Sequence, residues 1–160
     1  MSKGVVLLLI FACLFSLGAC SAKEGGSNGY SSQEDNKIDR WGLRVEAQDV
    51  APSGLKLVYY QFGGFGVKEL ITGRYFKLYM WDGTEYVPVP YLPGVEDRLA
   101  WPMDAFGISK FRITSFNVNW EHRYGQLPAG EYRIGKEIMN NGSSDYDDEE
   151  MIYAYFEIEP

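Results

Sequence analysis

The feature that most constrains the fold is a series of short β-rich runs separated by Gly, Pro, Asn and Asp. In residues 41–47, apolar side chains at odd positions alternate with glycine and charged side chains at even positions, the period of a strand with one buried face. No window of 12 residues carries a helical apolar stripe, although a helical turn could form within residues 95–106. We therefore expect an all-β protein, an antiparallel β-sandwich of about seven strands, with a small barrel as the alternative.

The alternation places the expected strands between recognisable turns. Turns are expected at Ala51–Gly54, Asp82–Gly83 and Leu127–Gly130, and Pro88 places the run that contains it at a sheet edge. Residues 91–110 are expected to be mainly irregular. The expected strands are residues 41–47, 55–62, 75–81, 85–89, 116–120, 131–139 and 151–158.

The N-terminal segment has the composition of an export signal. Lys3 precedes an apolar stretch, Val5–Leu17, that is shorter than the roughly 20 residues needed to span a bilayer. The sequence Leu17-Gly18-Ala19-Cys20 follows and resembles the lipobox of bacterial lipoproteins. The resemblance implies removal of residues 1–19 and lipid attachment to Cys20. The alternatives are an ordinary cleaved signal peptide and a retained N-terminal anchor.

This interpretation divides the chain into three parts: a lipoprotein signal peptide (1–19), a lipidated cysteine with a polar, flexible tether (20–40), and a folded domain (41–160). We expect the protein to partner the cell membrane through lipid on Cys20 and to face away from the cytoplasm. Cys13 would leave with the signal, so no disulfide is expected. Loss of Lys3 would change the net charge from −7 to −8, which argues against a nucleic-acid partner.

Residues of the second half carry a family resemblance. Asn119-Trp120-Glu121 and the segment Tyr124–Lys136, which contains Leu-Pro-Ala-Gly-Glu-Tyr, resemble the bacterial Ig-like domains found in exported lipoproteins. The resemblance implies an Ig-like sandwich, here without a disulfide, and brings no shared catalytic residues. In such sandwiches a tyrosine near the start of a late strand bonds back to the preceding corner, and Tyr132 is placed for that role.

Residues suited to catalysis or metal binding are few. His122 is the single histidine and lies beside Glu121 and Arg123, so we interpret it as a surface residue and expect no catalytic residues, no metal and no cofactor. The acidic stretch 145–150 is the one concentration of hard oxygen ligands, but its spacing does not match an EF-hand loop. A solvated loop is favoured over a calcium site. Its residues Asp145, Asp147 and Asp148 are binding candidates because they lie in an end loop.

Aromatic residues supply the other binding candidates. Tyr79 and Trp81 share the parity of Lys77, which predicts that they lie together on an outer sheet face, where they could stack on sugars or contact a protein. The plainer interpretation is that strands simply favour aromatics. We expect a membrane-anchored, non-catalytic Ig-like module that binds or has a structural role at the cell envelope. The alternatives are a carbohydrate or cell-wall glycan binder and an accessory subunit of an envelope enzyme or sensor.

Overall fold

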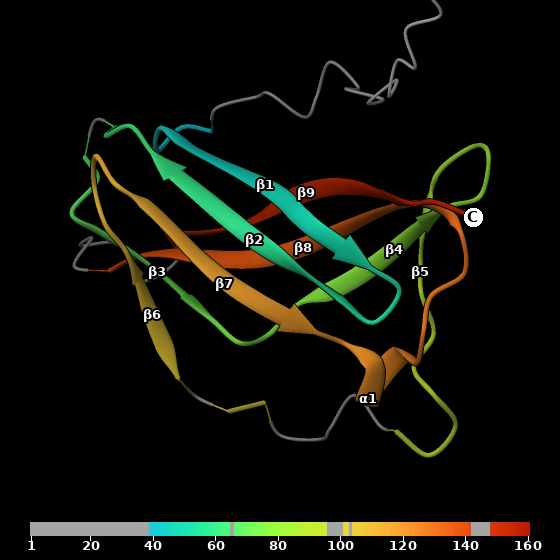
Figure 1. The fold of residues 1–160 in the computed structure, drawn as a ribbon. Coiled ribbons are helices and arrows are strands. Elements are labelled where there is room, and N and C mark those ends of the chain that lie inside the picture. The colour runs from blue at the N-terminus through green and yellow to red at the C-terminus, as the bar shows by residue number, and fades with distance from the viewer. Residues whose placement is uncertain (1–38, 65, 96–100, 103, 142–147) are drawn as a thin grey trace, which may run out of the picture. The chain divides into compact units, whose positions relative to one another are not determined.

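Two antiparallel β-sheets packed face to face make up the fold (Figure 1). The computed structural model describes residues 39–64, 66–95, 101–102, 104–141 and 148–160. Within these ranges there are nine strands and one helix of four residues, α1 (Glu121–Tyr124). The strands are β1 (Leu43–Ala51), β2 (Gly54–Gln61), β3 (Glu69–Gly73), β4 (Lys77–Trp81), β5 (Tyr86–Pro88), β6 (Ala105–Ile108), β7 (Ile113–Asn119), β8 (Gly130–Asn141) and β9 (Glu149–Ile158).

The smaller sheet has the order β1-β2-β7. A two-residue turn, Pro52–Ser53, joins β1 to β2, because Ala51 pairs with Gly54. The register shifts between Gln48 and Ala51, where Asp49 has a φ of 50°. Strand β7 lies at one edge of this sheet, and its inward side chains, Phe116 among them, alternate with exposed ones.

The larger sheet is organised around the long strand β8. One edge of β8 pairs with β9 along almost its whole length. The other edge pairs with two strands in succession, β4 near the start of β8 and β3 near its end. Strand β5 then extends the sheet beyond β4, and β6 extends it beyond β3.

The sheet contains a break where β8 changes partner. Pairing with β3 stops at Thr72–Ile138, and pairing with β4 starts at Lys77–Gly135. The connecting residues 74–76 lie outside both strands. Backbone carbonyl groups at this break therefore need hydrogen-bond donors other than the N–H groups of β8.

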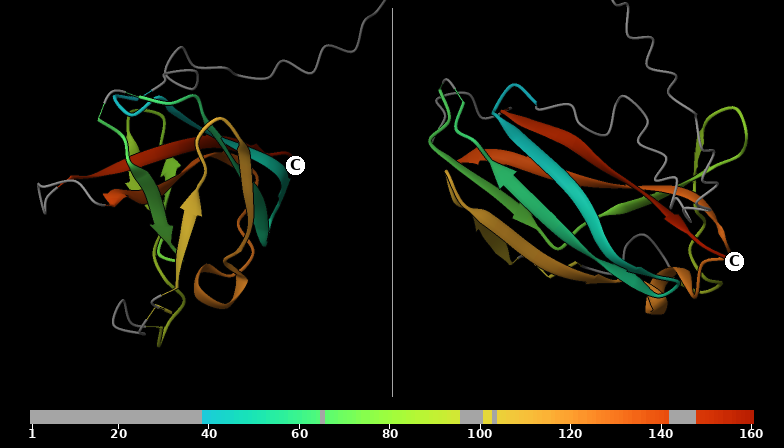
Figure 2. Two further views of the ribbon diagram at one scale, coloured as in Figure 1. Left: turned by 90° about the vertical axis from the view of Figure 1, so that its left-hand side faces the viewer. Right: turned by 45° about the horizontal axis from the view of Figure 1, so that its top comes forward.

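Strand β1 lies beside β9 (Figures 1 and 2), and the interior next to β9 holds a stack of buried aromatic side chains. Trp120 is fully buried and stacks on Phe156 at a centroid distance of 5.6 Å, and Phe156 stacks in turn on Tyr132 at 5.5 Å. The Trp120 indole N–H donates to the Pro52 carbonyl oxygen at 2.8 Å. This stack therefore ties the turn of the smaller sheet to β8 and β9 of the larger one.

The predicted sandwich is confirmed, and each of the seven expected strands has a counterpart. Two further strands, β3 and β6, were not predicted. Residues 105–108 were assigned to an irregular segment with a helical turn, and this assignment is wrong because they form β6 against β3. The single described helix, α1, was not predicted either. The described residues contain no cysteine, and none of their helices is long and apolar enough to cross a membrane.

Candidate functional site

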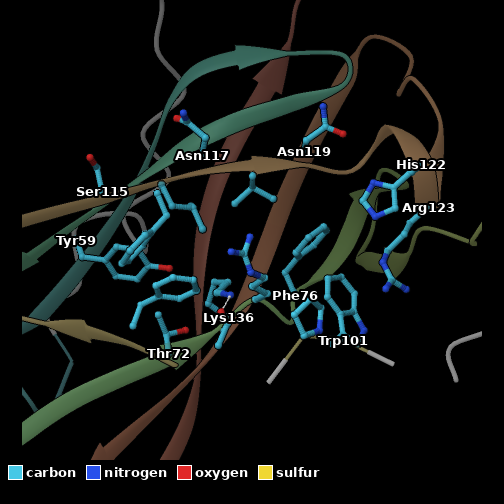
Figure 3. Close-up of a pocket in the computed structure, with 17 residues that line it drawn as sticks. Tyr59, Thr72, Phe76, Trp101, Ser115, Asn117, Asn119, His122, Arg123 and Lys136 are labelled. Carbon is cyan, nitrogen blue, oxygen red and sulfur yellow. Dashed lines mark hydrogen bonds between the residues drawn. The ribbon is translucent and has the colours of Figure 1, made fainter. Parts of the chain in front are cut away.

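The two sheets diverge on the side of β7 and leave a pocket of about 490 Å³ between them (Figure 3). Strand β7 borders the pocket on one side, β3, the break after it and Trp101 border it on the other, and β8 lies behind. A volume of this size falls within the roughly 300–1,000 Å³ typical of small-molecule sites. The lining residues are Leu57, Tyr59, Thr72, Gly73, Arg74, Phe76, Trp101, Pro102, Phe106, Ser115, Phe116, Asn117, Val118, Asn119, His122, Arg123 and Lys136.

Lys136 occupies the middle of the pocket, between the end formed by Tyr59 and Thr72 and the end formed by Arg123 (Figure 3). It faces the interior because β8 alternates and Ile134 and Ile138 on either side of it are fully buried. Its ammonium group donates to the carbonyl oxygens of Gly73 and Tyr75, at 2.5 and 2.6 Å. Lys136 therefore satisfies the carbonyl groups at the break in the larger sheet.

The charge of Lys136 is held in an apolar setting. The residue is only 4% exposed, and burial lowers the pKa of its ammonium group to about 8, although attraction to Glu137 offsets part of that effect. None of the described residues that line the pocket is Asp or Glu. The ammonium group is therefore mostly charged at neutral pH, with carbonyl dipoles rather than a carboxylate as its immediate partners.

Arg123 brings a second cation to the other end of the pocket. It is 6% exposed, and its Cζ atom lies 3.7 Å from the centroid of the Trp101 ring, a close cation–π contact. Helix α1 places it there, because Arg123 N–H and Tyr124 N–H both donate to the Trp120 carbonyl oxygen. His122, by contrast, is exposed and lies at the rim beside Arg123 (Figure 3).

Aromatic side chains form the pocket walls. Phe76 contacts Trp101 edge to face at a centroid distance of 5.0 Å, and Phe106 contacts Phe116 at 4.9 Å. Tyr59 packs against Phe116 at 5.7 Å, and burial raises the pKa of the Tyr59 hydroxyl, which the nearby Thr72 hydroxyl offsets only in part. The pocket thus combines apolar walls with two buried cations.

Tyr132 lies on the same strand as Lys136 and fixes the corner before β8. Its buried hydroxyl group donates to the Pro128 carbonyl oxygen at 2.9 Å, four residues upstream, which is the geometry of a tyrosine corner. The sequence model of the bacterial Ig-like domain family matches residues 39–157. The chain belongs to this family. Among curated proteins and among solved structures, no match to it was found.

The outer face of the larger sheet carries the predicted aromatic residues of this Ig-like domain. Tyr79 is half-buried and Trp81 is 37% exposed, on the side of β4 opposite the buried Leu78. Tyr79 pairs with Arg133 across the sheet, and the Arg133 Cζ atom lies 4.2–4.8 Å from the ring centroids of Tyr79, Tyr86 and Tyr153. The rings meet edge to face or tilted, so this surface is a cluster around one cation rather than a flat row.

The acidic segment is described only in part. Asp145 and Asp147 lie outside the described residues. Asp148 forms an ion pair with Arg40 at 2.8 Å and accepts a hydrogen bond from the Asn140 side chain at 2.7 Å. Arg40 also contacts Glu150 at 3.1 Å. The described end of this segment is thus engaged in fixing the N-terminal entry of the Ig-like domain to β8 and β9.

No group of three or more His, Cys, Asp or Glu suited to a metal ion occurs within the described ranges. His122 lies beside Arg123 in the pocket lining, and the described lining offers no carboxylate to orient it, as a Ser–His–Asp arrangement would require. The described side chains of the pocket can donate hydrogen bonds and neutralise a negative charge.

Sequence reasoning missed Lys136 and Arg123 as pocket residues. For Lys136 the signal was present, since period-two alternation places it on the same face as Tyr132, Ile134 and Ile138. For Arg123 no comparable signal exists, because a four-residue helix between two strands sets its direction.

Proposed function

We propose that this protein is a lipid-anchored, non-catalytic binding module of the bacterial cell envelope, and that its inter-sheet pocket is the binding site. The observation that carries the binding role is the pocket of about 490 Å³ with two buried cations and aromatic walls. A buried lysine that contacts backbone carbonyl groups on one side and a pocket on the other is costly to maintain, and a bound ligand would compensate that cost.

The anchoring part rests on the sequence. Cys20 ends the lipobox-like sequence Leu17-Gly18-Ala19-Cys20, whose leucine is the last residue of the apolar run Val5–Leu17. Lipid on Cys20 would hold the Ig-like domain at the outer face of a membrane, and more than one acyl chain is needed for a stable anchor.

The anchor is tested by metabolic labelling of the full chain with an alkyne fatty acid in a bacterial host. Wild type is expected to take up the label and to sediment with membranes, and Cys20→Ser is expected to lose both. Cys13→Ser removes the other cysteine and is expected to behave as wild type. Label that persists in Cys20→Ser would refute lipidation at this position.

The binding site is tested by a small-fragment screen on ¹⁵N-labelled full-length protein. Hits are expected to shift backbone amides of residues 72–76 and 115–118, which border the pocket from both sheets. Hits that shift only β4 and β9 amides would contradict the pocket as the binding site.

A second candidate site has its own support. The aromatic cluster around Arg133 on the outer face of the larger sheet presents Trp81 to solvent, and such surfaces suit a cell-wall glycan or a protein partner. Titration with peptidoglycan fragments tests it. Shifts confined to β4, β8 and β9 that disappear in Trp81→Ala would favour this site over the pocket.

A further inference from the structure

The charge balance of the pocket differs from that of the whole chain. The chain has a net charge of −7, yet the described lining contains the cations Lys136, Arg123 and Arg74 and no carboxylate. Arg74 lies at the exposed rim, where its Nε atom is 2.8 Å from a carboxylate oxygen of Asp104. The positive charge deeper in the pocket therefore comes from Lys136 and Arg123.

Of these cations, Lys136 is the one whose charge a bound anion would stabilise most. An ammonium group has three N–H donors, and the Gly73 and Tyr75 carbonyl oxygens accept two of them. These acceptors are dipoles, and they leave the unit charge of a nearly buried group without a counter-charge in the described lining. A single negative charge placed in the pocket would neutralise it in a low-dielectric setting.

The pocket walls define the rest of the ligand. Phe76, Phe106 and Phe116 present apolar ring surface on both sides of the pocket. An inorganic anion would lose its hydration there and leave these rings without a packing partner. An organic anion with an apolar ring or chain would bury the ring surface and bring one charge to one ammonium group.

We propose that the pocket binds a small organic monocarboxylate, with its carboxylate group at Lys136 and its apolar ring or chain packed among Phe76, Phe106 and Phe116. This inference rests on the proposed function of the pocket as the binding site. It adds the chemical class of the ligand, which the fragment screen above leaves open.

The first experiment compares four probes on the wild-type full chain by isothermal titration calorimetry in detergent. The probes are phenylacetate, its neutral isostere 2-phenylacetamide, acetate and inorganic phosphate. Phenylacetate is expected to bind at least about tenfold more tightly than each of the others, because only it supplies both the charge and the ring. Equal affinity for phenylacetate and 2-phenylacetamide would overturn the carboxylate assignment and leave the pocket as a binding site intact.

The second experiment compares two variants that each remove one lysine charge. Lys136→Met is expected to weaken phenylacetate binding at least about tenfold and to leave 2-phenylacetamide binding unchanged. Lys56→Met is the control, because Lys56 lies on β2 between the buried Leu55 and Leu57 and contacts Asp49 at 3.8 Å outside the pocket. It is expected to bind phenylacetate as wild type does. Unaltered phenylacetate affinity in folded Lys136→Met would overturn the inference, and circular dichroism establishes folding. If this variant fails to fold, the comparison of acid and amide on wild type decides alone.

Discussion

The pocket and the outer face of the larger sheet both bring aromatic rings to a cation on β8, yet they do so in opposite ways. On the outer face, Arg133 lies within 5 Å of three tyrosine ring centroids and remains partly open to water. In the pocket, Lys136 is buried and contacts two backbone carbonyl groups. The two residues are three positions apart on one strand. The comparison teaches that the two faces of one strand give its cations different surroundings: aromatic rings and water around Arg133, and backbone carbonyl groups in a buried pocket around Lys136.

The largest difference is expected when one aromatic ring is truncated in the pocket and one on the outer face. Phe76→Ala removes a ring that is 3% exposed and in contact with Trp101, and it should lower the free energy of unfolding by about 3 kcal/mol. Trp81→Ala removes a ring on the outer face and should cost less than about 1 kcal/mol. Urea denaturation measures both. Equal losses in the free energy of unfolding would mean that the two faces are packed alike and would contradict the comparison.

A smaller effect is expected from the titration of Lys136. Its pKa is lowered from 10.5 to about 8 in the folded state, so the unfolded chain binds more protons between these values and stability rises with pH. From pH 7.5 to 9.5 the gain should be about 2 kcal/mol.

The gain is measured as the difference between wild type and Lys136→Met across that range, so that contributions from other titrating groups cancel. Arg133→Met on the outer face should leave the pH dependence of wild type unchanged. A wild-type curve parallel to that of Lys136→Met would show that Lys136 is solvated in the folded state.

The smallest effect is expected at the corner tyrosine. Tyr132→Phe keeps the ring stacked on Phe156 and removes the hydrogen bond to the Pro128 carbonyl oxygen, which should cost about 1–2 kcal/mol. Tyr79→Phe is the matched control on the outer face, where water can replace the partners of the hydroxyl group, and it should cost a few tenths of a kcal/mol. The two melting curves should therefore separate; if they coincide, the corner hydrogen bond contributes nothing to stability.

Much of the sandwich could be predicted because its strands carry their own signal. The alternation in residues 131–139 and the turn at Ala51–Gly54 are local properties, and the structure reproduces both. Strands β3 and β6 are different, because each is short, β6 contains Gly107, and each exists through its pairing partners. Periodicity within a window of a few residues does not report such distant pairing.

The candidate site was predictable only in part for the same reason. The parity of Tyr79 and Trp81 follows from β4 alone, and the structure places both on the outer face. The pocket depends on how far two sheets diverge and on where β8 changes partner, and both are relations between distant segments. Lys136 could be assigned to the inner face by parity, but the carbonyl groups that it contacts could not be identified.

The partner change along β8 has a consequence for how this fold can vary. Register fixes the length of a strand paired on both sides, so an added residue there turns every following side chain to the other face. Residues 74–76 escape this constraint, because they lie between β3 and β4 and outside both. An insertion at this point would reshape the pocket while the two sheets kept their registers, and the cost of lengthening a loop grows slowly with its length. The break is thus a place where an insertion that leaves Phe76 buried can reshape the pocket without shifting the register of either sheet, and a natural position for building a library of altered pockets.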